Sequence, residues 1–161
     1  MVVLRKMRKE EYPAYCQCFI DEYSQELAQN YGHTMDGAIE LAKKDLHRCF
    51  PNGPESDENS LLCIEAEIDG KPGVVGYLWH TINIEDESTF ICDFYVSDDY
   101  RGQGYGEEAI SVLERQLQLA GIKQIKLRVA YHNERALKLY KEAGFSITGI
   151  NMSKMLGKTP A

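Results

Sequence analysis

The sequence of 161 residues has no apolar run near the roughly 20 residues that a membrane-spanning helix requires, so we expect no membrane partner. No long apolar stretch follows Met1, which argues against a signal peptide and favours a cytoplasmic protein. The five cysteines form no C-x-x-C motif, and an odd number is a poor basis for disulfides or a zinc site. The four histidines form no H-E-x-x-H motif, so the sequence predicts no metal.

Positive charge is also scarce: the sequence has 18 basic and 25 acidic residues, so its net charge is -7. This balance disfavours a protein that binds the phosphate backbone of nucleic acid. It suits a small cationic or amine-bearing partner better. The length fits one domain over residues 1–161 with room for a hydrophobic core.

The hydrophobic periodicity predicts a change from helices to a sheet and back to alternating helices and strands. The predicted elements are a strand over 2–7, helices over 12–30 and 34–50, strands over 62–68, 74–84 and 89–96, a helix ending at 120–121, a strand over 125–129, a helix over 133–143 and a last strand near Met155. Short turns predict an antiparallel meander for the three middle strands. The helix between the strands that end at Val96 and Val129 implies a parallel crossover. We therefore predict an α+β fold with a mixed, mostly antiparallel sheet flanked by helices.

The segment most typical of a binding site runs from Val96 to Gly106, where a predicted strand leads into a predicted helix. Its three closely spaced glycines allow a tight turn that exposes successive backbone N–H groups. The helix N-terminus adds further N–H donors and a partial positive charge. Arg101 supplies a cation just before the turn. These features predict a cradle for a pyrophosphate group.

Two nucleotide-binding motifs are excluded. A Walker loop needs Lys-Ser or Lys-Thr after its glycines, and neither is present. A Rossmann fingerprint would need glycine where Glu107 stands, and it would not follow three antiparallel strands. The structural alternative is a glycine-rich turn that binds no ligand. An arginine followed by alternating glycines at the start of a helix is too particular a pattern for such a turn.

The segment matches the pattern [QR]-x-x-G-x-[GA] through Arg101, Gly104 and Gly106, and it resembles the signature of the GNAT superfamily of acyl-CoA-dependent N-acyltransferases. Residues 133–145 resemble the second signature of that family, N-x-x-A-x-x-L-Y-x-x-x-G-F. The resemblance implies acetyl-CoA as co-substrate, no metal, and a parallel strand pair splayed around the CoA site.

The resemblance also implies a role for each matching residue. Strand residues would bind the pantetheine arm of CoA through their backbones, and the glycine-rich turn would hold the pyrophosphate. Asn133 would contact the pantetheine or its surroundings, and Tyr140 would protonate the departing CoA thiolate. The complete set of expected cofactor contacts is Phe94, Tyr95, Val96, Arg101, Gly102, Gln103, Gly104, Tyr105, Gly106, Asn133, Arg135 and Ala136.

Two predicted catalytic residues have structural alternatives. Tyr140 is protonated at neutral pH and fits a proton donor, although its position on a helical stripe between two alanines also fits core packing. Period two places Asp93 on the same strand face as Ile91 and Tyr95, among apolar neighbours. It resembles an acidic position in polyamine-type members of the family. Asp93 would bind a cationic amine, accept its proton through water, or pair with Arg128.

The favoured function is an N-acetyltransferase that moves an acetyl group from acetyl-CoA to a primary amine by direct attack in a ternary complex. The acceptor would be a small molecule or a peptide, which leaves polyamines, aminoglycosides, amino acids and protein N-termini open. The alternatives are a non-catalytic module that binds acyl-CoA and a structural domain with an empty cleft. A homodimer is a further hypothesis, and no nucleic-acid partner is expected.

Overall fold

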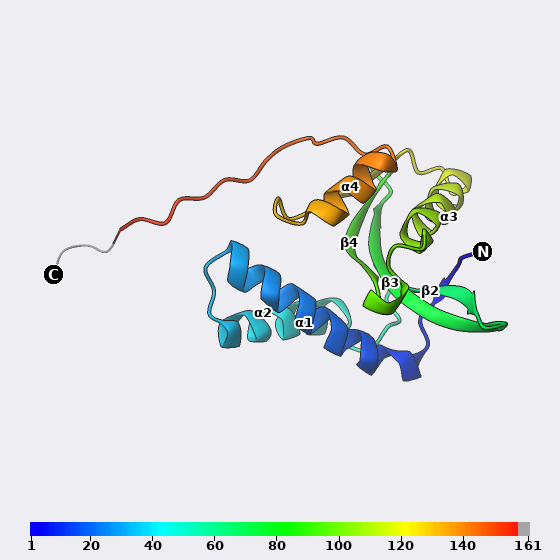
Figure 1. The fold of residues 1–161 in the computed structure, drawn as a ribbon, viewed down its shortest axis with the longest axis horizontal. Coiled ribbons are helices and arrows are strands. Elements are labelled where there is room, and N and C mark those ends of the chain that lie inside the picture. Colours follow the sequence, from blue (N-terminus) through cyan, green and yellow to red (C-terminus); the bar gives the residue numbers. More distant parts are fainter. Residues whose placement is uncertain (158–161) are drawn as a thin grey trace.

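The computed structural model describes residues 1–157, which form a five-stranded sheet covered by helices on both faces (Figure 1). The strands lie in chain order and are β1 (Val3–Lys6), β2 (Asn59–Ile68), β3 (Lys71–Asn83), β4 (Ser88–Val96) and β5 (Gln124–Leu127). The helices are α1 (Tyr12–Asn30), α2 (Met35–Cys49), α3 (Tyr105–Leu119) and α4 (Glu134–Glu142), with short 3-10 turns at Lys9–Glu11 and Asp98–Tyr100.

Strands β1 to β4 pair antiparallel, and β5 pairs parallel to β4 after the crossover through α3. Both predictions, the meander and the parallel crossover, are confirmed. Side-chain caps lie at the start of two helices: Thr34 Oγ1 accepts a hydrogen bond from the Gly37 amide, and Asn133 Oδ1 accepts one from the Ala136 amide.

Each face of the sheet has its own hydrophobic core. On one face, Ile110 and Leu113 of α3 and Tyr140 of α4 pack against β1 to β4. On the other face, Tyr15 and Phe19 of α1 join α2 and the strands in an aromatic cluster around Trp79. The sheet is therefore a wall between an α1–α2 layer and an α3–α4 layer (Figure 1).

Strands β4 and β5 separate after a short stretch of pairing. Ser88 to Ile91 pair with Gln124 to Leu127, and β4 then continues to Val96 with no β5 residue opposite it. The last five residues of β4 thus expose one backbone edge, as the predicted splayed pair requires.

A β-bulge in this region corrects the predicted orientation of Asp93. Asp93 lies opposite Trp79, but Ile91 lies opposite His80, so Cys92 is an extra residue without a partner on β3. The extra residue reverses the alternation of side chains. Ile91 belongs to the core on the α3 side, whereas Asp93 bonds to Tyr15 on the α1 side. The expectation that Asp93 shares a face with Ile91 is therefore wrong.

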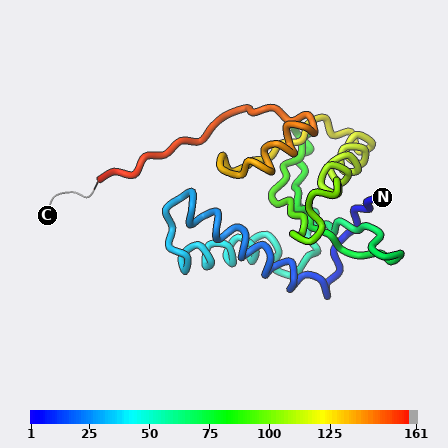
Figure 2. Tube along the Cα trace, in the orientation of Figure 1, coloured from blue at the N-terminus to red at the C-terminus, as the bar shows by residue number. Residues whose placement is uncertain are grey.

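The predicted last strand near Met155 is also wrong. Residues 145–157 follow α4 without joining a strand, and the trace runs away from the sheet (Figure 2). The segment alternates apolar and polar residues as a strand does, but in this structure no strand lies beside it. None of the helices within residues 1–157 is long and apolar enough to cross a membrane.

Gly76 permits the close approach of β3 to the end of β4. It lies opposite Val96, and a Cβ atom there would overlap the carbonyl oxygen of Tyr95. We expect Gly76→Ala to lower the free energy of unfolding by about 1–3 kcal/mol or more, because backbone would have to move. Urea denaturation measures this loss.

Gly73→Ala is the matched control on the same strand. A Cβ there would lie 3.2 Å from Cγ1 of Ile68, a side chain that is able to shift. Its effect on stability should be clearly smaller, and equal losses for the two variants would contradict the proposed backbone constraint.

Candidate active site

The glycine-rich turn has the geometry of an anion cradle. Gly102 and Gly104 have φ values of +77° and +86°, and a Cβ atom at either would meet nothing within 4 Å. Gly104 is the N-cap of α3, and it leaves the first amides of the helix without a side-chain cap. Open space in front of uncapped helix amides fits a diphosphate, so the predicted cradle is compatible with the structure.

Gly106 has a packing role, and its expected contact with pyrophosphate stays a prediction. A Cβ there would lie 3.3 Å from Leu139 Cδ2 and 3.7 Å from Phe94 Cε1. The absence of a side chain at this position lets the first turn of α3 approach α4 and the end of β4. Sequence alone does not separate this packing role from contact with phosphate.

Arg101 fastens the turn to β4. Its Nε donates to the carbonyl oxygen of Val96 over 2.7 Å, it forms an ion pair with Asp98, and its guanidinium lies 5.2 Å from the centre of the Tyr95 ring. These contacts show a positioning role, and its direct contact with pyrophosphate remains a prediction.

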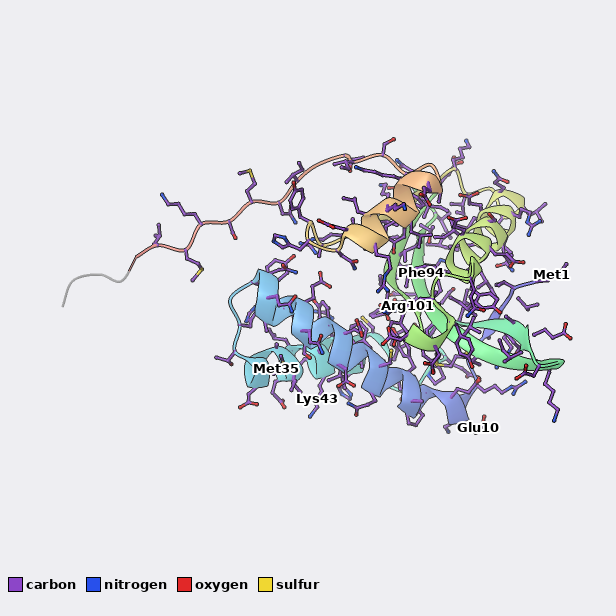
Figure 3. All side chains as sticks on the ribbon, viewed as in Figure 1. Met1, Glu10, Met35, Lys43, Phe94 and Arg101 are labelled. Atoms are coloured by element: carbon purple, nitrogen blue, oxygen red, sulfur yellow. The ribbon has the colours of Figure 1, made fainter. Side chains whose placement is uncertain are left out.

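The other expected cofactor residues surround the exposed edge of β4. The Gln103 side-chain amide donates to the carbonyl oxygen of Asp99 over 3.4 Å, and Tyr105 packs on Tyr100. Phe94 lies beside Tyr140, with 6.3 Å between the ring centres. Figure 3 shows Phe94 and Arg101 close to β4, between the two helical layers.

The N-terminus of α4, unlike that of α3, has a side-chain cap. Asn133 caps it, the neighbouring Arg135 is exposed, and the Ala136 amide is bonded to Asn133 over 3.2 Å. The structure thus gives Asn133 a capping function. Its contact with pantetheine, and the proximity of Arg135 and Ala136 to CoA, remain predictions.

Asp93 is held by α1. Tyr15, whose side chain is fully buried, donates its hydroxyl proton to Oδ2 of Asp93 over 2.8 Å. Burial raises the pKa of Asp93 to about 6, the Tyr15 hydrogen bond opposes that shift, and the charges of Glu22 and Glu26 add to it. Arg128, the alternative partner, instead pairs with Glu26 over 3.2 Å.

Tyr140 is 8% exposed and lies between Phe94 and Phe145. Burial raises its pKa, and the charge of Asp93 raises it further, so the hydroxyl is protonated at neutral pH. Asp93 faces α1 and Tyr140 packs on the α4 side of the sheet, so the charge of Asp93 acts on Tyr140 from the opposite face of β4. Core packing and proton donation are therefore compatible roles for this side chain.

Tyr15, Glu22 and Glu26 were not identified from the sequence as site residues. All three lie on α1, for which the sequence predicts a helix and no site residue. The available signal is a tyrosine on the buried face near the start of this helix, because a buried tyrosine hydroxyl needs a polar partner.

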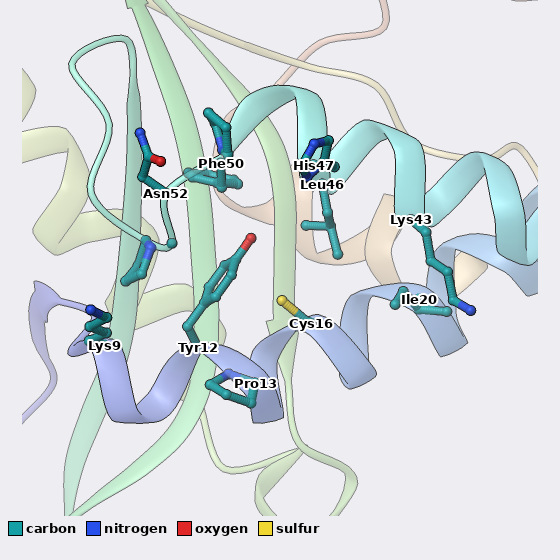
Figure 4. Close-up of a pocket in the computed structure, with 13 residues that line it drawn as sticks. Lys9, Tyr12, Pro13, Cys16, Ile20, Lys43, Leu46, His47, Phe50 and Asn52 are labelled. Atoms are coloured by element: carbon teal, nitrogen blue, oxygen red, sulfur yellow. The ribbon is translucent and has the colours of Figure 1, made fainter.

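A separate groove of about 540 Å³ lies between α1, α2 and the loop at residues 51–54 (Figure 4). Tyr12, Cys16 and Ile20 line it from α1, and Leu46 and His47 line it from α2. It contains none of the predicted cofactor or catalytic residues, so it does not belong to the candidate active site.

A sheet that parts beside a glycine-rich turn, with the uncapped N-terminus of α3 following the exposed end of β4, is compatible with an elongated, phosphate-bearing cofactor. The family model "Acetyltransferase (GNAT) family" matches residues 12–145, and the chain belongs to this family of acetyltransferases. The use of acetyl-CoA follows from membership of the family, and the uncapped turn at Gly104 fits it.

Known proteins are similar to nearly the whole chain or to about half of it. The "Uncharacterized N-acetyltransferase YycN" of Bacillus subtilis is 31% identical over 159 residues, which are 96% of this chain and 99% of that protein. The crystal structure of YycN has a TM-score of 0.88, is 29% identical, and covers 98% of this chain and 100% of its own. The thialysine N-epsilon-acetyltransferase of Bos taurus is 34% identical over 91 residues, 51% of this chain and 54% of that protein.

The cradle leads to a prediction about CoA binding. Gly104→Val should lower CoA affinity by at least about 10-fold, because a β-branched residue is strained at positive φ and places atoms in front of the helix amides. Isothermal titration calorimetry with CoA measures this change.

Gly70→Val is the matched control, since Gly70 has a φ of +79° and equally open surroundings in the turn between β2 and β3. It should lose similar stability and keep CoA affinity. A folded Gly104→Val protein that binds CoA as the parent does would refute the cradle.

Proposed function

We propose that this protein is an N-acetyltransferase that transfers an acetyl group from acetyl-CoA to a primary amine by direct attack in a ternary complex. The observation that carries the proposal is that a desolvated carboxylate, Asp93, and a protonated phenol, Tyr140, both lie at the part of β4 that has no partner on β5, Asp93 on the strand itself and Tyr140 against Phe94. Amide formation needs one group that takes a proton and another that gives one.

In the overall reaction, the carbonyl carbon of the thioester gains a bond to the amine nitrogen and loses its bond to sulfur. One proton leaves the nitrogen, and one proton reaches the sulfur. We assign the first transfer to Asp93, directly or through water, and the second to the hydroxyl of Tyr140. Backbone N–H groups at the unpaired end of β4 would stabilise the negative charge that develops on the carbonyl oxygen.

The acceptor is proposed to be a small amine that carries positive charge. Glu22 and Glu26 of α1 act electrostatically on Asp93, and because Glu26 is paired with Arg128, Asp93 and Glu22 carry the net negative charge on the α1 side of β4. This charge attracts an ammonium group and disfavours an anionic acceptor. The partial similarity to a thialysine N-epsilon-acetyltransferase agrees with an acceptor of this kind.

The test is a panel of primary amines with acetyl-CoA, followed by detection of released CoA thiol and of the acetylated amine. Release that depends on a cationic amine supports the proposal. Tight CoA binding with no release across the panel would favour a non-catalytic binding module and refute the enzyme assignment.

Tyr140→Phe tests the proton donor. We expect turnover to fall by about 10- to 1,000-fold, with CoA affinity and fold retained, because the ring still packs but the proton is lost. Steady-state kinetics and calorimetry measure the two quantities. Turnover equal to that of the parent would mean that water or another residue protonates the thiolate.

Tyr15→Phe and Asp93→Asn test the carboxylate. The ionised form of Asp93 accepts the proton, so activity should fall as the pH drops through its pKa of about 6. Loss of the Tyr15 hydroxyl removes a bond that favours the charged form, so this limb of the kcat/KM profile should move to higher pH. Asp93→Asn should raise the KM for a cationic amine and leave acetyl-CoA binding nearly unchanged.

Tyr23→Phe serves as the control, because Tyr23 lies on the same helix and its hydroxyl faces Asp45 instead. Its pH profile should match that of the parent. Loss of stability in Tyr15→Phe without any change of the profile would leave Tyr15 a purely structural residue.

A further inference from the structure

An ion pair joins α1 to the end of β5 beside the point where β4 and β5 part. Nη1 of Arg128 lies 3.2 Å from Oε1 of Glu26, and the guanidinium lies 5.2 Å from the centre of the Tyr31 ring. Arg128 is the first residue after β5, and Tyr31 is the first residue after α1. These contacts place the guanidinium on the α1 side of the sheet, the side on which Asp93 bonds to Tyr15.

The strand register brings this ion pair near Asp93. Leu127 and Ile91 are the last residues that pair between β5 and β4. Arg128 lies one residue beyond that pair, and Asp93 lies two residues beyond it. At about 3.3 Å per residue, neither is more than about 7 Å along its strand from the pair. Besides burial, the charge of Glu26 raises the pKa of Asp93, so Glu26 acts on Asp93 and Arg128 alike.

The Arg128–Glu26 pair retains capacity for a ligand. Its side chains are 41% and 35% exposed, and the contact between them uses one guanidinium nitrogen. A guanidinium presents five N–H donors in a planar fork that matches a carboxylate, and a glutamate carboxylate accepts from an ammonium. The pair is therefore complementary to a carboxylate with an ammonium beside it, which is the head group of an α-amino acid. A polyamine would instead bring an ammonium group against Arg128, and like charges repel.

We infer that the acceptor is an α-amino acid with a second amine at the end of its side chain, an inference that rests on the proposed N-acetyltransferase function. Its carboxylate binds Arg128, its α-ammonium binds Glu26, and its side-chain amine reaches Asp93. The side-chain nitrogen gains the acetyl group and loses one proton, while the α-ammonium keeps its protons. Two ammonium groups and one carboxylate leave this acceptor cationic, in agreement with the negative charge of Asp93 and Glu22.

Lysine and ornithine are compared with cadaverine and putrescine, which are the same molecules without the carboxylate. Each amino acid should have a kcat/KM at least about 10-fold above that of its diamine, because a hydrogen-bonded carboxylate is lost in the diamine. Thiol detection measures the rates, and tandem mass spectrometry should place the acetyl group on the side-chain nitrogen.

Two failures are distinguishable in this comparison. Absence of the preference, or acetylation at the α-nitrogen, would overturn the inference and leave the enzyme assignment intact where a cationic amine still releases CoA. If no amine of the panel releases CoA, the proposed function itself is wrong, and the inference falls with it.

Arg128→Gln distinguishes recognition of the carboxylate from a structural link between α1 and β5. It should lower kcat/KM for lysine by at least about 10-fold and leave the value for cadaverine unchanged, because the diamine has no group for the guanidinium. Lys126→Gln is the matched control, since Lys126 lies on β5 and also forms an ion pair over 3.2 Å, with Asp86. It should change neither value. Equal losses for the two acceptors in Arg128→Gln would make Arg128 a structural residue and overturn the inference.

Discussion

The β-bulge at Cys92 is the constraint on which the site depends. One extra residue in β4 reverses the alternation of side chains, so Asp93 faces α1 while Phe94 faces α4. Without the bulge, the carboxylate would enter the core against α3, where no polar partner is found for it in the described residues. The bulge lies just beyond the last residue of β4 that pairs with β5. The change in direction of the Asp93 side chain and the end of the β4–β5 pairing therefore occur at the same place.

The parting of β4 from β5 then gives the backbone a functional surface. An unpaired strand edge costs free energy unless it finds hydrogen-bond partners. The glycine-rich turn and the start of α3 follow directly at the end of this edge, and Arg101 bonds the turn back to Val96. Gly76 and Gly106 let β3 and α4 approach from the two sides. The position of the glycine-rich turn therefore depends on the register of the strands and on close packing at Gly76 and Gly106 as much as on the glycine-rich sequence motif.

The sequence predicted the features that depend on local chemistry. The meander, the parallel crossover and the tight turn at Gly102 and Gly104 follow from residue type and spacing. It did not predict the direction of Asp93, because a bulge depends on pairing with another strand. It did not reveal Tyr15 as the partner of Asp93, since the two are 78 residues apart. The prediction of a strand near Met155 was wrong because the alternation of apolar and polar residues indicates a strand but does not specify the neighbour it would pair with.

The coupling between Asp93 and Tyr140 gives the two proposed proton transfers an order. The pKa of Asp93, about 6, lies some 4 units below that of a lysine-like amine, so deprotonation before attack would cost about 6 kcal/mol. The transfer becomes favourable only as the nitrogen bonds to carbon and its acidity rises. The negative charge of Asp93 raises the pKa of Tyr140. Once Asp93 accepts the amine proton, that charge disappears and Tyr140 becomes the stronger acid at the moment when the thiolate needs its proton.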